Sequence, residues 1–438
     1  MLNDTICAIS TSLSNGAISI IRMSGEDSFE IIKKIAHLKD EKIKPNHIIY
    51  GHIFDNEEII DEVMISFFKA PKSFTREDMV EINCHGGIYV TKTILQLVVK
   101  EGARLADKGE FSKRAYLNGR INLTQAESIN DLINAKNNLQ GKSAIKGVSG
   151  SIGDLLKPFM EDLKELINKI QVNIDYPEYE DEIQIINDDI KDKLVYWQDF
   201  GKVLLNKSIR FNNVKNGIKT AIVGKPNVGK SSLLNALINE DKAIVTDIAG
   251  TTRDIVEGEV ILDNVTLSLI DTAGIRDSED TIERIGIEKS KKIIEDASLV
   301  LVVLDSNNIN DEDKEIIDLC KDKNYILVYN KNDLVKKEGI SISALNGDIK
   351  KLVDKINEMY SEDYKLQDDD LLNNDRQIGL FRRCLDELDN LLNMIDVISI
   401  DIAIINLESA YNYLAEIIGL DYREDLIDNM FKKFCLGK

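Results

Sequence analysis

The chain has 438 residues, of which 43% are hydrophobic and 30% charged, and its formal net charge is −21. This composition is typical of a globular protein of roughly two to four domains. An acidic surface repels phosphate, which argues against nonspecific wrapping of nucleic acid but does not exclude RNA held by a basic patch or by a partner. The five cysteines form no C-x-x-C pair, which argues against a zinc knot or a disulfide framework and favours a reducing cytosol.

We find no basic N-terminal region followed by an apolar stretch, and the longest apolar run, near Leu299–Leu304, is too short to span a bilayer. We therefore expect a cytoplasmic protein without a membrane segment.

Residues 1–118 predict an N-terminal α+β domain. Ala17–Arg22 and Glu62–Phe68 are typical of strands, and Thr91–Lys100 has the apolar spacing of a helix. Residues 119–215 predict the first part of an all-helical domain, with a long helix over Leu155–Ile170. The run Tyr176–Glu182 predicts an exposed acidic turn.

Residues 216–370 alternate strand and helix patterns, which favours βαβ units on a mostly parallel sheet. The predicted buried strands are Ile218–Val223, Val265–Ile270, Leu299–Leu304 and Tyr325–Val328. After the acidic linker Gln367–Asp370, residues 371–438 become helical again. The simplest architecture inserts the α/β module into one helical domain whose two halves pack together.

Gly224–Ser231 fits the phosphate-loop pattern G-x-x-x-x-G-K-[ST]. Backbone N–H groups of such a loop point at the β-phosphate, Lys230 should reach the β- and γ-phosphates, and the Ser231 hydroxyl should hold Mg²⁺. The loop residues predicted to bind nucleotide are Asn227, Val228, Gly229, Lys230, Ser231 and Ser232.

Two segments between the predicted strands have the character of nucleotide switches. In the first, the Thr252 hydroxyl is expected to complete the Mg²⁺ shell; its candidate residues are Thr246, Asp247, Ile248, Ala249, Gly250, Thr251 and Thr252. In the second, Asp271 should reach Mg²⁺ through water and the Gly274 N–H should report the γ-phosphate; its candidates are Asp271, Thr272, Ala273 and Gly274.

A third segment, Asn330–Asp333, predicts which nucleotide base the protein binds. A carboxylate at Asp333 accepts hydrogen bonds from guanine N1–H and the exocyclic amine, and adenine lacks both donors at those places. The base site takes in Asn330, Lys331, Asn332 and Asp333, followed by Ser343, Ala344 and Leu345. The four motifs in this order predict a Ras-like P-loop GTPase domain that uses GTP. Ile275 stands where Ras-type GTPases place a water-orienting glutamine, so another group must orient the water.

The chain resembles the tRNA modification GTPase family MnmE, also called TrmE, over essentially its whole length. The markers inside the nucleotide module are Gly224–Asn235, Gly250–Asp254 and Glu283–Gly286. Outside it they are Ala70–Thr75, His85–Gly87, Ala115–Arg120 and the terminal Cys435–Lys438.

The resemblance implies a homodimer through the N-terminal domains and a heterotetramer with a flavoprotein of the MnmG/GidA type, which carries FAD. Together they would modify C5 of the wobble uridine of tRNA with an aminomethyl or carboxymethylaminomethyl group. The one-carbon unit would come from 5-formyl- or 5,10-methylene-tetrahydrofolate, and GTP hydrolysis would depend on K⁺.

The resemblance also assigns residues. Asn227, Thr246, Ile248 and Thr251 match K⁺ ligands, Glu283 matches the carboxylate that positions water, and Lys230, Glu283 and Cys435 become the candidate catalytic residues. Arg22, Glu81, Arg120 and Lys438 match the folate site. The terminal residues are expected beside that site, across the dimer.

Structural interpretations stay open for the candidate residues outside the nucleotide module. From the residues alone, Arg22 and Glu81 are better explained as a structural ion pair, Cys84-His85 as structural, and Cys435 as an ordinary tail cysteine. The chain also departs from the family pattern, with Arg120 for lysine, Leu436 for isoleucine, Phe74 for tyrosine and Arg76 for glycine.

Two other functions compete with a modifying enzyme. One is a ribosome-assembly GTPase of the Era/Der type, which would add a KH-like GXXG loop or a second GTPase module, and the sequence has neither. The other is a regulatory GTPase that binds only proteins, which would not need a folate-like N-terminal domain.

Overall fold

The computed structural model describes most of the chain and divides it into two compact units. The described residues are 4–38, 46–175, 180–238, 256–262, 265–270, 291, 293–335, 337–395, 400–420, 430–432, 434 and 437. One unit comprises Met1–Ile133, Gly147–Gly153 and Tyr411–Lys438, and the other comprises Asn134–Lys146 and Asp154–Ala410. The domain boundaries expected after residues 118, 215 and 370 stay predictions.

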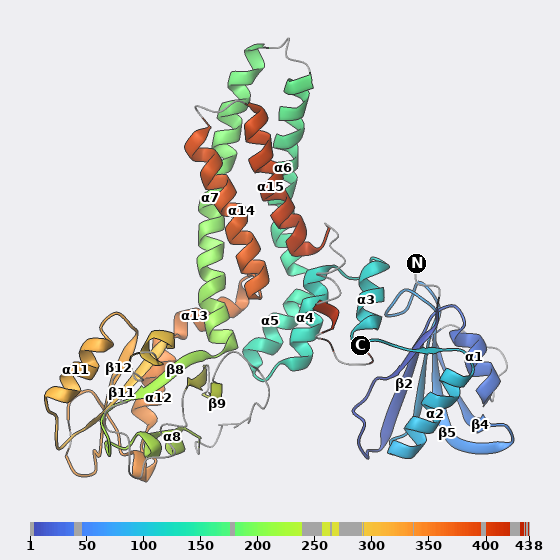
Figure 1. The fold of residues 1–438 in the computed structure, drawn as a ribbon, viewed down its shortest axis with the longest axis horizontal. Coiled ribbons are helices and arrows are strands. Elements are labelled where there is room, and N and C mark those ends of the chain that lie inside the picture. Colours follow the sequence, from blue (N-terminus) through green and yellow to red (C-terminus); the bar gives the residue numbers. More distant parts are fainter. Residues whose placement is uncertain are drawn as a thin grey trace. The chain divides into compact units, whose positions relative to one another are not determined.

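The first unit is built on a seven-stranded sheet of order β3-β4-β5-β6-β2-β1-β7. Its strands are β1 (Ile6–Ile9), β2 (Ile18–Ser24), β3 (Ala36–Leu38), β4 (His47–Asp55), β5 (Glu58–Phe68), β6 (Met79–His85) and β7 (Arg104–Leu105). Helices α1 (Ser28–Ile35) and α2 (Ile88–Lys100) cover one face (Figure 1). The strands expected at residues 17–22 and 62–68 and the helix at 91–100 are confirmed.

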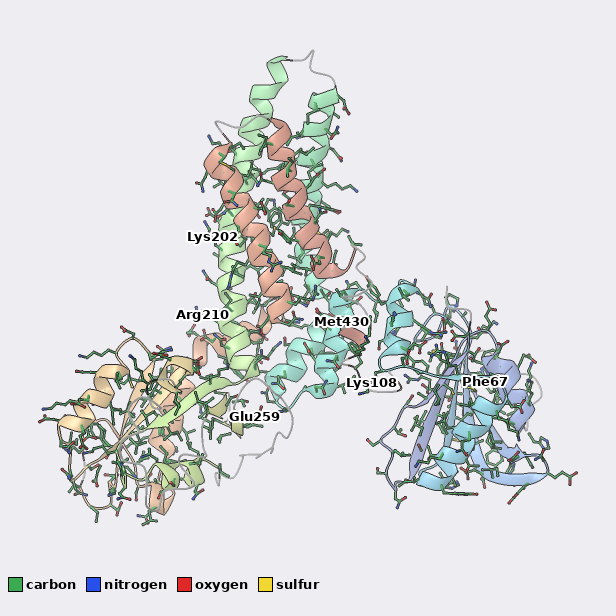
Figure 2. The ribbon with its side chains drawn as sticks, viewed as in Figure 1. Phe67, Lys108, Lys202, Arg210, Glu259 and Met430 are labelled. Carbon is green, nitrogen blue, oxygen red and sulfur yellow. The ribbon has the colours of Figure 1, made fainter. Side chains whose placement is uncertain are left out.

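Side-chain alternation explains which face of this sheet packs against α1 and α2. In β2, Ile21 and Met23 are fully buried, while Ile20 and Arg22, which alternate with them, are half-buried on the other face. Phe67 of β5 is fully buried in the core beneath the helices (Figure 2). Burying each such side chain contributes about 1.5–3 kcal/mol.

The end of the chain packs within this same unit. Helices α3 (Glu110–Leu117) and α4 (Leu123–Asn134) follow the sheet. Tyr116 and Leu123 form a small core with Phe431 and Phe434, and the Tyr116 hydroxyl donates to the Gly419 carbonyl at 2.7 Å. The C-terminal segment therefore returns to the start of the helical region.

The second unit contains a helical bundle in which α6, α7, α14 and α15 lie side by side (Figure 1). The helices are α5 (Asn138–Ser149), α6 (Ser151–Asp175), α7 (Glu180–Asn216), α14 (Asp375–Met394) and α15 (Ile400–Ile418). The Trp197 ring of α7 stacks on Phe159 of α6 at 4.4 Å, and Phe381 of α14 meets Phe159 edge-on. The two helical halves thus pack together, as predicted.

One local prediction in this region is wrong in part. The turn expected over residues 176–182 is wrong for Glu180, Asp181 and Glu182, because these three residues are the first of α7. Residues 176–179 lie outside the described part. Glutamate and aspartate near a helix N-terminus are favoured by the helix dipole, so acidic residues here fit a helix start.

The nucleotide module forms the rest of this unit, on a six-stranded sheet of order β13-β12-β11-β8-β10-β9. Its strands are β8 (Ile218–Val223), β9 (Val256–Ile261), β10 (Thr266–Ile270), β11 (Leu299–Asp305), β12 (Tyr325–Asn330) and β13 (Ile340–Ser341). All neighbours are parallel except β9 and β10, so the predicted mostly parallel sheet and its four buried strands are confirmed. Its helices are α8 (Lys230–Ile238), α11 (Asp311–Leu319) and α12 (Lys350–Met359).

Several polar contacts fasten the module to the helices. Lys136 makes an ion pair of 3.0 Å with Glu259 of β9, which Figure 2 labels, and Asn137 donates to the Thr266 hydroxyl at 2.9 Å. The acidic linker is held too, since Lys207 of α7 pairs with Asp369 at 2.8 Å. The helices α13 (Ser361–Lys365) and η2 (Leu366–Asp368) lead into it. Within the described residues, none of the helices combines the length and hydrophobicity that a membrane crossing requires.

Candidate functional site

The phosphate loop lies between β8 and α8, at the carboxyl end of a central parallel strand. Gly224 and Gly229 take positive φ values of 152° and 97°. A Cβ at Gly229 would stand 2.2 Å from the Asn330 side chain, and one at Gly224 would stand 2.3 Å from the Val303 carbonyl oxygen. Only glycine fits at these two points, which leaves a tight loop open to an anion at the N-terminus of α8.

Lys230 is the first residue of α8, and its ammonium folds back over the loop. Its Nζ donates to the carbonyl oxygens of Gly224 at 2.9 Å and Lys225 at 2.7 Å. Burial lowers the pKa of Lys230, since a charged ammonium is disfavoured away from water. A phosphate group beside it would favour the charged form again.

Asn330 ties the phosphate loop to the predicted base site. Its amide donates to the Val228 carbonyl at 2.9 Å, and its side-chain oxygen accepts the Ala344 N–H at 3.0 Å. The side chain is buried at the end of β12, so both hydrogen bonds are shielded from water. One neutral amide therefore connects the phosphate loop, the segment Asn330–Asp333 and the segment Ser343–Ala344.

The carboxylate of Asp333 is held by a hydroxyl rather than by a cation. Ser343 Oγ donates to Asp333 Oδ1 at 2.7 Å, and Asn346 donates to Ser343 Oγ at 3.0 Å. The second oxygen of Asp333 has no hydrogen bond within the described part of the chain. Leu345 next to this site is 84% exposed. The site thus presents an open carboxylate oxygen beside an uncovered apolar side chain.

Two ion pairs that the sequence did not predict brace this edge. Lys331, at a φ of 65°, pairs with Asp305 at 2.6 Å, and Lys225 pairs with the fully buried Asp313 at 2.7 Å. Burial opposes ionisation of Asp305, but the hydrogen bond from Lys331 outweighs it and holds the pKa of Asp305 below its usual range. The first pair depends on β11 and β12 being neighbours in the sheet, since β11 ends at Asp305 and β12 ends directly before Lys331.

Much of the predicted nucleotide site lies outside the described residues. This holds for the whole segment from Thr246 to Thr252, for Asp271–Gly274 and for Glu283. Strand β10 ends at Ile270, directly before Asp271 in the chain, and β9 begins at Val256, shortly after the first switch. The roles of these residues in Mg²⁺, K⁺ and water binding stay predictions, as does the role of Ser231.

A second candidate site lies on the face of the N-terminal sheet opposite α1 and α2. Arg22 of β2 and Glu81 of β6 are direct strand partners. Arg22 Nε and Nη2 both reach Glu81 Oε1, at 2.8 and 2.7 Å, and each side chain is only about one-fifth exposed, at 21% and 20%. The ion pair expected from the residues is present. Glu81 Oε2 has no hydrogen bond among the residues that the structure describes.

Aromatic rings and the chain's end surround this pair. The Arg22 guanidinium lies over the rings of Phe74 and Phe111, at 5.8 and 5.7 Å, and Arg120 lies over Phe74 at 4.7 Å. The structure thus brings together Arg22, Glu81 and Arg120, which are scattered over 99 positions of sequence.

Gly437, the residue before Lys438, lies at the same place. Its carbonyl oxygen accepts from Arg22 Nη1 at 3.3 Å and from Ser10 Oγ at 3.1 Å. This contact is made within one chain. Cys435 and Lys438 themselves lie outside the described residues, so their predicted roles are not tested.

Cys84 and His85 do not join either site in the described structure. Cys84 is buried, and burial raises the pKa of its thiol. His85 Nδ1 lies 2.6 Å from Asp61 Oδ1, and this hydrogen bond raises the pKa of the imidazole. Both observations agree with the structural interpretation of the pair.

Comparison with known families covers nearly the whole chain. The family model described as GTP-binding protein TrmE N-terminus matches residues 5–120, and the MnmE helical domain model matches residues 123–435.

Curated relatives match over their full length as well. The tRNA modification GTPase MnmE of Mesoplasma florum is 48% identical over 100% of this chain and 99% of its own. The proteins of that name from Mycoplasma mycoides and Streptococcus gordonii are 45% and 44% identical, over 100% and 99% of both chains.

Fold and site together define a multidomain protein of the P-loop GTPase class, with an N-terminal α+β domain and a helical domain around the nucleotide module. Identity at this level over the full length narrows the class to one family. The chain belongs to the tRNA modification GTPase MnmE family.

Proposed function

We propose that this protein hydrolyses GTP to GDP and phosphate and couples the hydrolysis to modification of the tRNA wobble uridine. The observation that carries the proposal is the Asn330 side chain, which joins the phosphate loop to Ala344 beside the Asp333 carboxylate. Phosphate recognition and base recognition are thereby held at one edge of one sheet.

Base choice follows from the open oxygen of Asp333. Guanine offers N1–H and an exocyclic amine to the two carboxylate oxygens, whereas adenine offers no donor at those places. Asp333 is exposed, so the base itself has to cover the carboxylate for the discrimination to reach its full size.

The residues of the phosphate loop suit a Mg²⁺-bound triphosphate. The glycine cradle admits phosphate oxygens, Lys230 can exchange two carbonyl partners for them, and the Ser231 hydroxyl is a hard oxygen ligand of the kind Mg²⁺ prefers. Thr252 and Asp271 would add further oxygens. The divalent cation would neutralise charge that develops on the phosphates.

We propose that Glu283 positions the water that attacks the γ-phosphate, because the side chain of Ile275 cannot orient it. Asn227, with a φ of 63° inside the loop, together with Thr246, Ile248 and Thr251, would hold K⁺. A monovalent cation there supplies the positive charge that an arginine finger supplies in other GTPases.

We propose that the N-terminal pocket binds a tetrahydrofolate derivative, either 5-formyl- or 5,10-methylene-tetrahydrofolate. The pterin ring has an N–H and an amine on one edge, and the free Oε2 of Glu81 can accept from it while Arg22 keeps the carboxylate charged. Lys438 follows Gly437 directly, which supports a place for the terminal lysine and Cys435 near this pocket.

The same face of the sheet supports a homodimer. Ile18, Ile48, Tyr50 and Met64 are exposed by 63%, 64%, 37% and 51%. Tyr50 of β4, Met64 of β5, Asn83 of β6 and Ile20 of β2 follow one another as strand partners across it. A monomer rarely leaves such a row uncovered. A cytoplasmic heterotetramer with an MnmG/GidA-like FAD protein, acting on tRNA, completes the proposal.

The test uses the full chain. GTP turnover measured in KCl should exceed turnover in NaCl by about 10-fold or more, and Glu283→Ala should lower kcat by about 100-fold with unchanged GTP affinity. Glu315→Ala, on an exposed turn of α11, is the control. Equal rates in the two salts would remove K⁺ from the mechanism.

The modification itself is tested by mass spectrometry of wobble uridine. The protein, its flavoprotein partner, GTP, methylene-tetrahydrofolate and an amine donor should produce the modified base, with ammonium for the aminomethyl group or glycine for the carboxymethylaminomethyl group. Omission of any one should abolish the product. Modification that proceeds without folate would contradict the proposed one-carbon donor.

A further inference from the structure

Beside the Arg22–Glu81 pair, the loop before β6 carries a second arginine in a conformation that suits glycine. Arg76 has a φ of 62°, in the left-handed region that costs a residue with a Cβ about 1–2 kcal/mol. A side chain kept in such a backbone conformation points to a use for it.

The loop is fixed, so the position of Arg76 is fixed as well. The Arg76 guanidinium donates to the Asn118 carbonyl at 2.9 Å, and the Asn118 amide donates back to the Thr75 carbonyl at 2.7 Å. Thr75 is fully buried and its hydroxyl lies 2.6 Å from Ser24 Oγ. These bonds hold Arg76 over residues 118–119, directly before Arg120.

Arg76 and Arg120 therefore form a pair of like charges. Both are exposed, and neither has a carboxylate partner in the part of the chain that the structure describes. Desolvation and then the charge of Arg76 lower the pKa of Arg120, so the two guanidinium groups oppose one another. The nearby Arg22, Arg104 and Arg114, by contrast, are all paired with glutamates.

The pair is continuous with the Arg22–Glu81 site. The guanidinium carbons of Arg22 and Arg120 lie 5.8 and 4.7 Å from the centre of the same Phe74 ring. One small molecule held by Glu81 at one end can thus reach Arg120 at the other. An acid with several carboxylates would relieve the repulsion between the two arginines and form charge-assisted hydrogen bonds with both.

We propose that Arg76 and Arg120 form an anion subsite for the carboxylates of a γ-linked glutamate chain, so that this protein prefers folates with several glutamates. The proposal rests on the folate site proposed above and adds its specificity. Arg76 supplies the second cation, and the ligand's first glutamate and those beyond it supply the matching negative charges.

Calorimetry on the full-length protein separates the two claims. The probes are 5-formyltetrahydrofolate with one glutamate and with three. We expect the triglutamate to bind about 10-fold more tightly to the wild type, and Arg76→Gly to remove that preference while changing monoglutamate affinity by less than about 3-fold. Glycine suits the backbone at position 76, so this variant should fold. Lys72→Ala removes an exposed positive charge from the same loop and should leave the preference intact.

The outcomes are distinct. Failure of both ligands to bind the wild type would overturn the folate site itself. Equal affinities for the two ligands, or equal losses of both in Arg76→Gly, would overturn only the glutamate subsite. If Arg76→Gly weakened tRNA binding in a filter assay and kept the triglutamate preference, the arginine pair would belong to an RNA surface and the proposal would be wrong.

Discussion

The nucleotide module and the N-terminal domain each contain one carboxylate for which we propose a ligand edge that carries an N–H and an amine, but the two carboxylates are held differently. Asp333 is fixed by the neutral hydroxyl of Ser343, and Glu81 by the guanidinium of Arg22. A hydroxyl leaves the full negative charge for the ligand, whereas a guanidinium already neutralises it. We therefore expect Asp333 to contribute more binding free energy than Glu81.

The interactions that hold the structure around the two carboxylates differ in the same way: they are neutral in the nucleotide module and ionic in the N-terminal domain. In the module, the neutral amide of Asn330 connects two loops. In the N-terminal domain, Arg114 is 1% exposed and pairs with Asp4, Glu77 and Glu110 at 2.7, 3.2 and 3.2 Å. A neutral connection should be insensitive to pH and an ionic one sensitive to it.

The largest effect is expected at Asp333. Asp333→Asn replaces an acceptor by a donor and removes two hydrogen bonds to a charged group, so GTP affinity should fall by about 100-fold. Xanthine nucleotides, whose 2-oxo group accepts from the new amide, should bind better than GTP. Competition with a fluorescent nucleotide measures both. Asp348→Asn, a nearby exposed carboxylate, is the matched control, and unchanged GTP preference in Asp333→Asn would remove Asp333 from the base site.

The second-largest effect is expected for Asn330→Ala. It leaves the Val228 carbonyl and the Ala344 N–H without their buried partner, which should lower the free energy of unfolding of the module by about 2 kcal/mol. The loss should be the same at pH 6 and pH 8, since no charge is involved. Urea unfolding followed by circular dichroism measures it, with Asn332→Ala as the control. A loss that changed with pH would contradict the neutral role of Asn330.

A smaller, pH-dependent effect is expected at Glu110. Burial raises the pKa of Glu110, but the hydrogen bond from Arg104, followed by those from Asp107 and Arg114, outweighs burial and leaves the pKa below its usual range. The folded state therefore favours the charged form, and this stability is fully present above the unfolded pKa and is lost as pH falls through the folded one.

Glu110→Gln should accordingly lower the free energy of unfolding by roughly 1–2 kcal/mol at pH 7, and this loss should shrink as pH falls below the usual glutamate range and through the lowered pKa of Glu110. Thermal unfolding across this range measures the difference. Glu30→Gln, in an exposed pair with Lys33, should change stability little at any pH. A constant difference between wild type and Glu110→Gln would mean that the ionic network does not stabilise the domain.

The two regions also differ in how far the sequence predicts them. The module's motifs are short loops at strand ends, so Gly224–Ser231 and Asn330–Asp333 could be read directly, and parallel pairing of β8, β11 and β12 brings them together. The sequence did not predict the Lys331–Asp305 pair because it depends on which strand ends are neighbours, nor the Lys225–Asp313 pair because it depends on where α11 lies relative to the phosphate loop.

The N-terminal site could not be derived from spacing at all. Arg22 and Glu81 meet only because β2 and β6 pair in one register, and a shift by one residue would turn one of them into the core. The family resemblance indicated these residues, but not that Phe74 lies between Arg22 and Arg120. Arg76 looked like a simple departure from the family pattern until its φ and its bond to Asn118 were known.

Of the two ligand-affinity effects, the smaller is expected at Glu81, and it tests the comparison most directly. Glu81→Gln keeps the size of the side chain but removes the charge that both Arg22 and the ligand's donors require. Because Arg22 already neutralises much of that charge, 5-formyltetrahydrofolate should lose only about 10-fold in affinity, compared with about 100-fold for GTP in Asp333→Asn. Calorimetry on the full chain measures this loss, and GTP turnover should not change.

Glu62→Gln is the control, since Glu62 lies on β5 four residues before Ser66, the strand partner of Glu81. A loss at Glu81 as large as that at Asp333 would show that the guanidinium does not weaken the carboxylate as an acceptor, and the contrast between the two sites would fail.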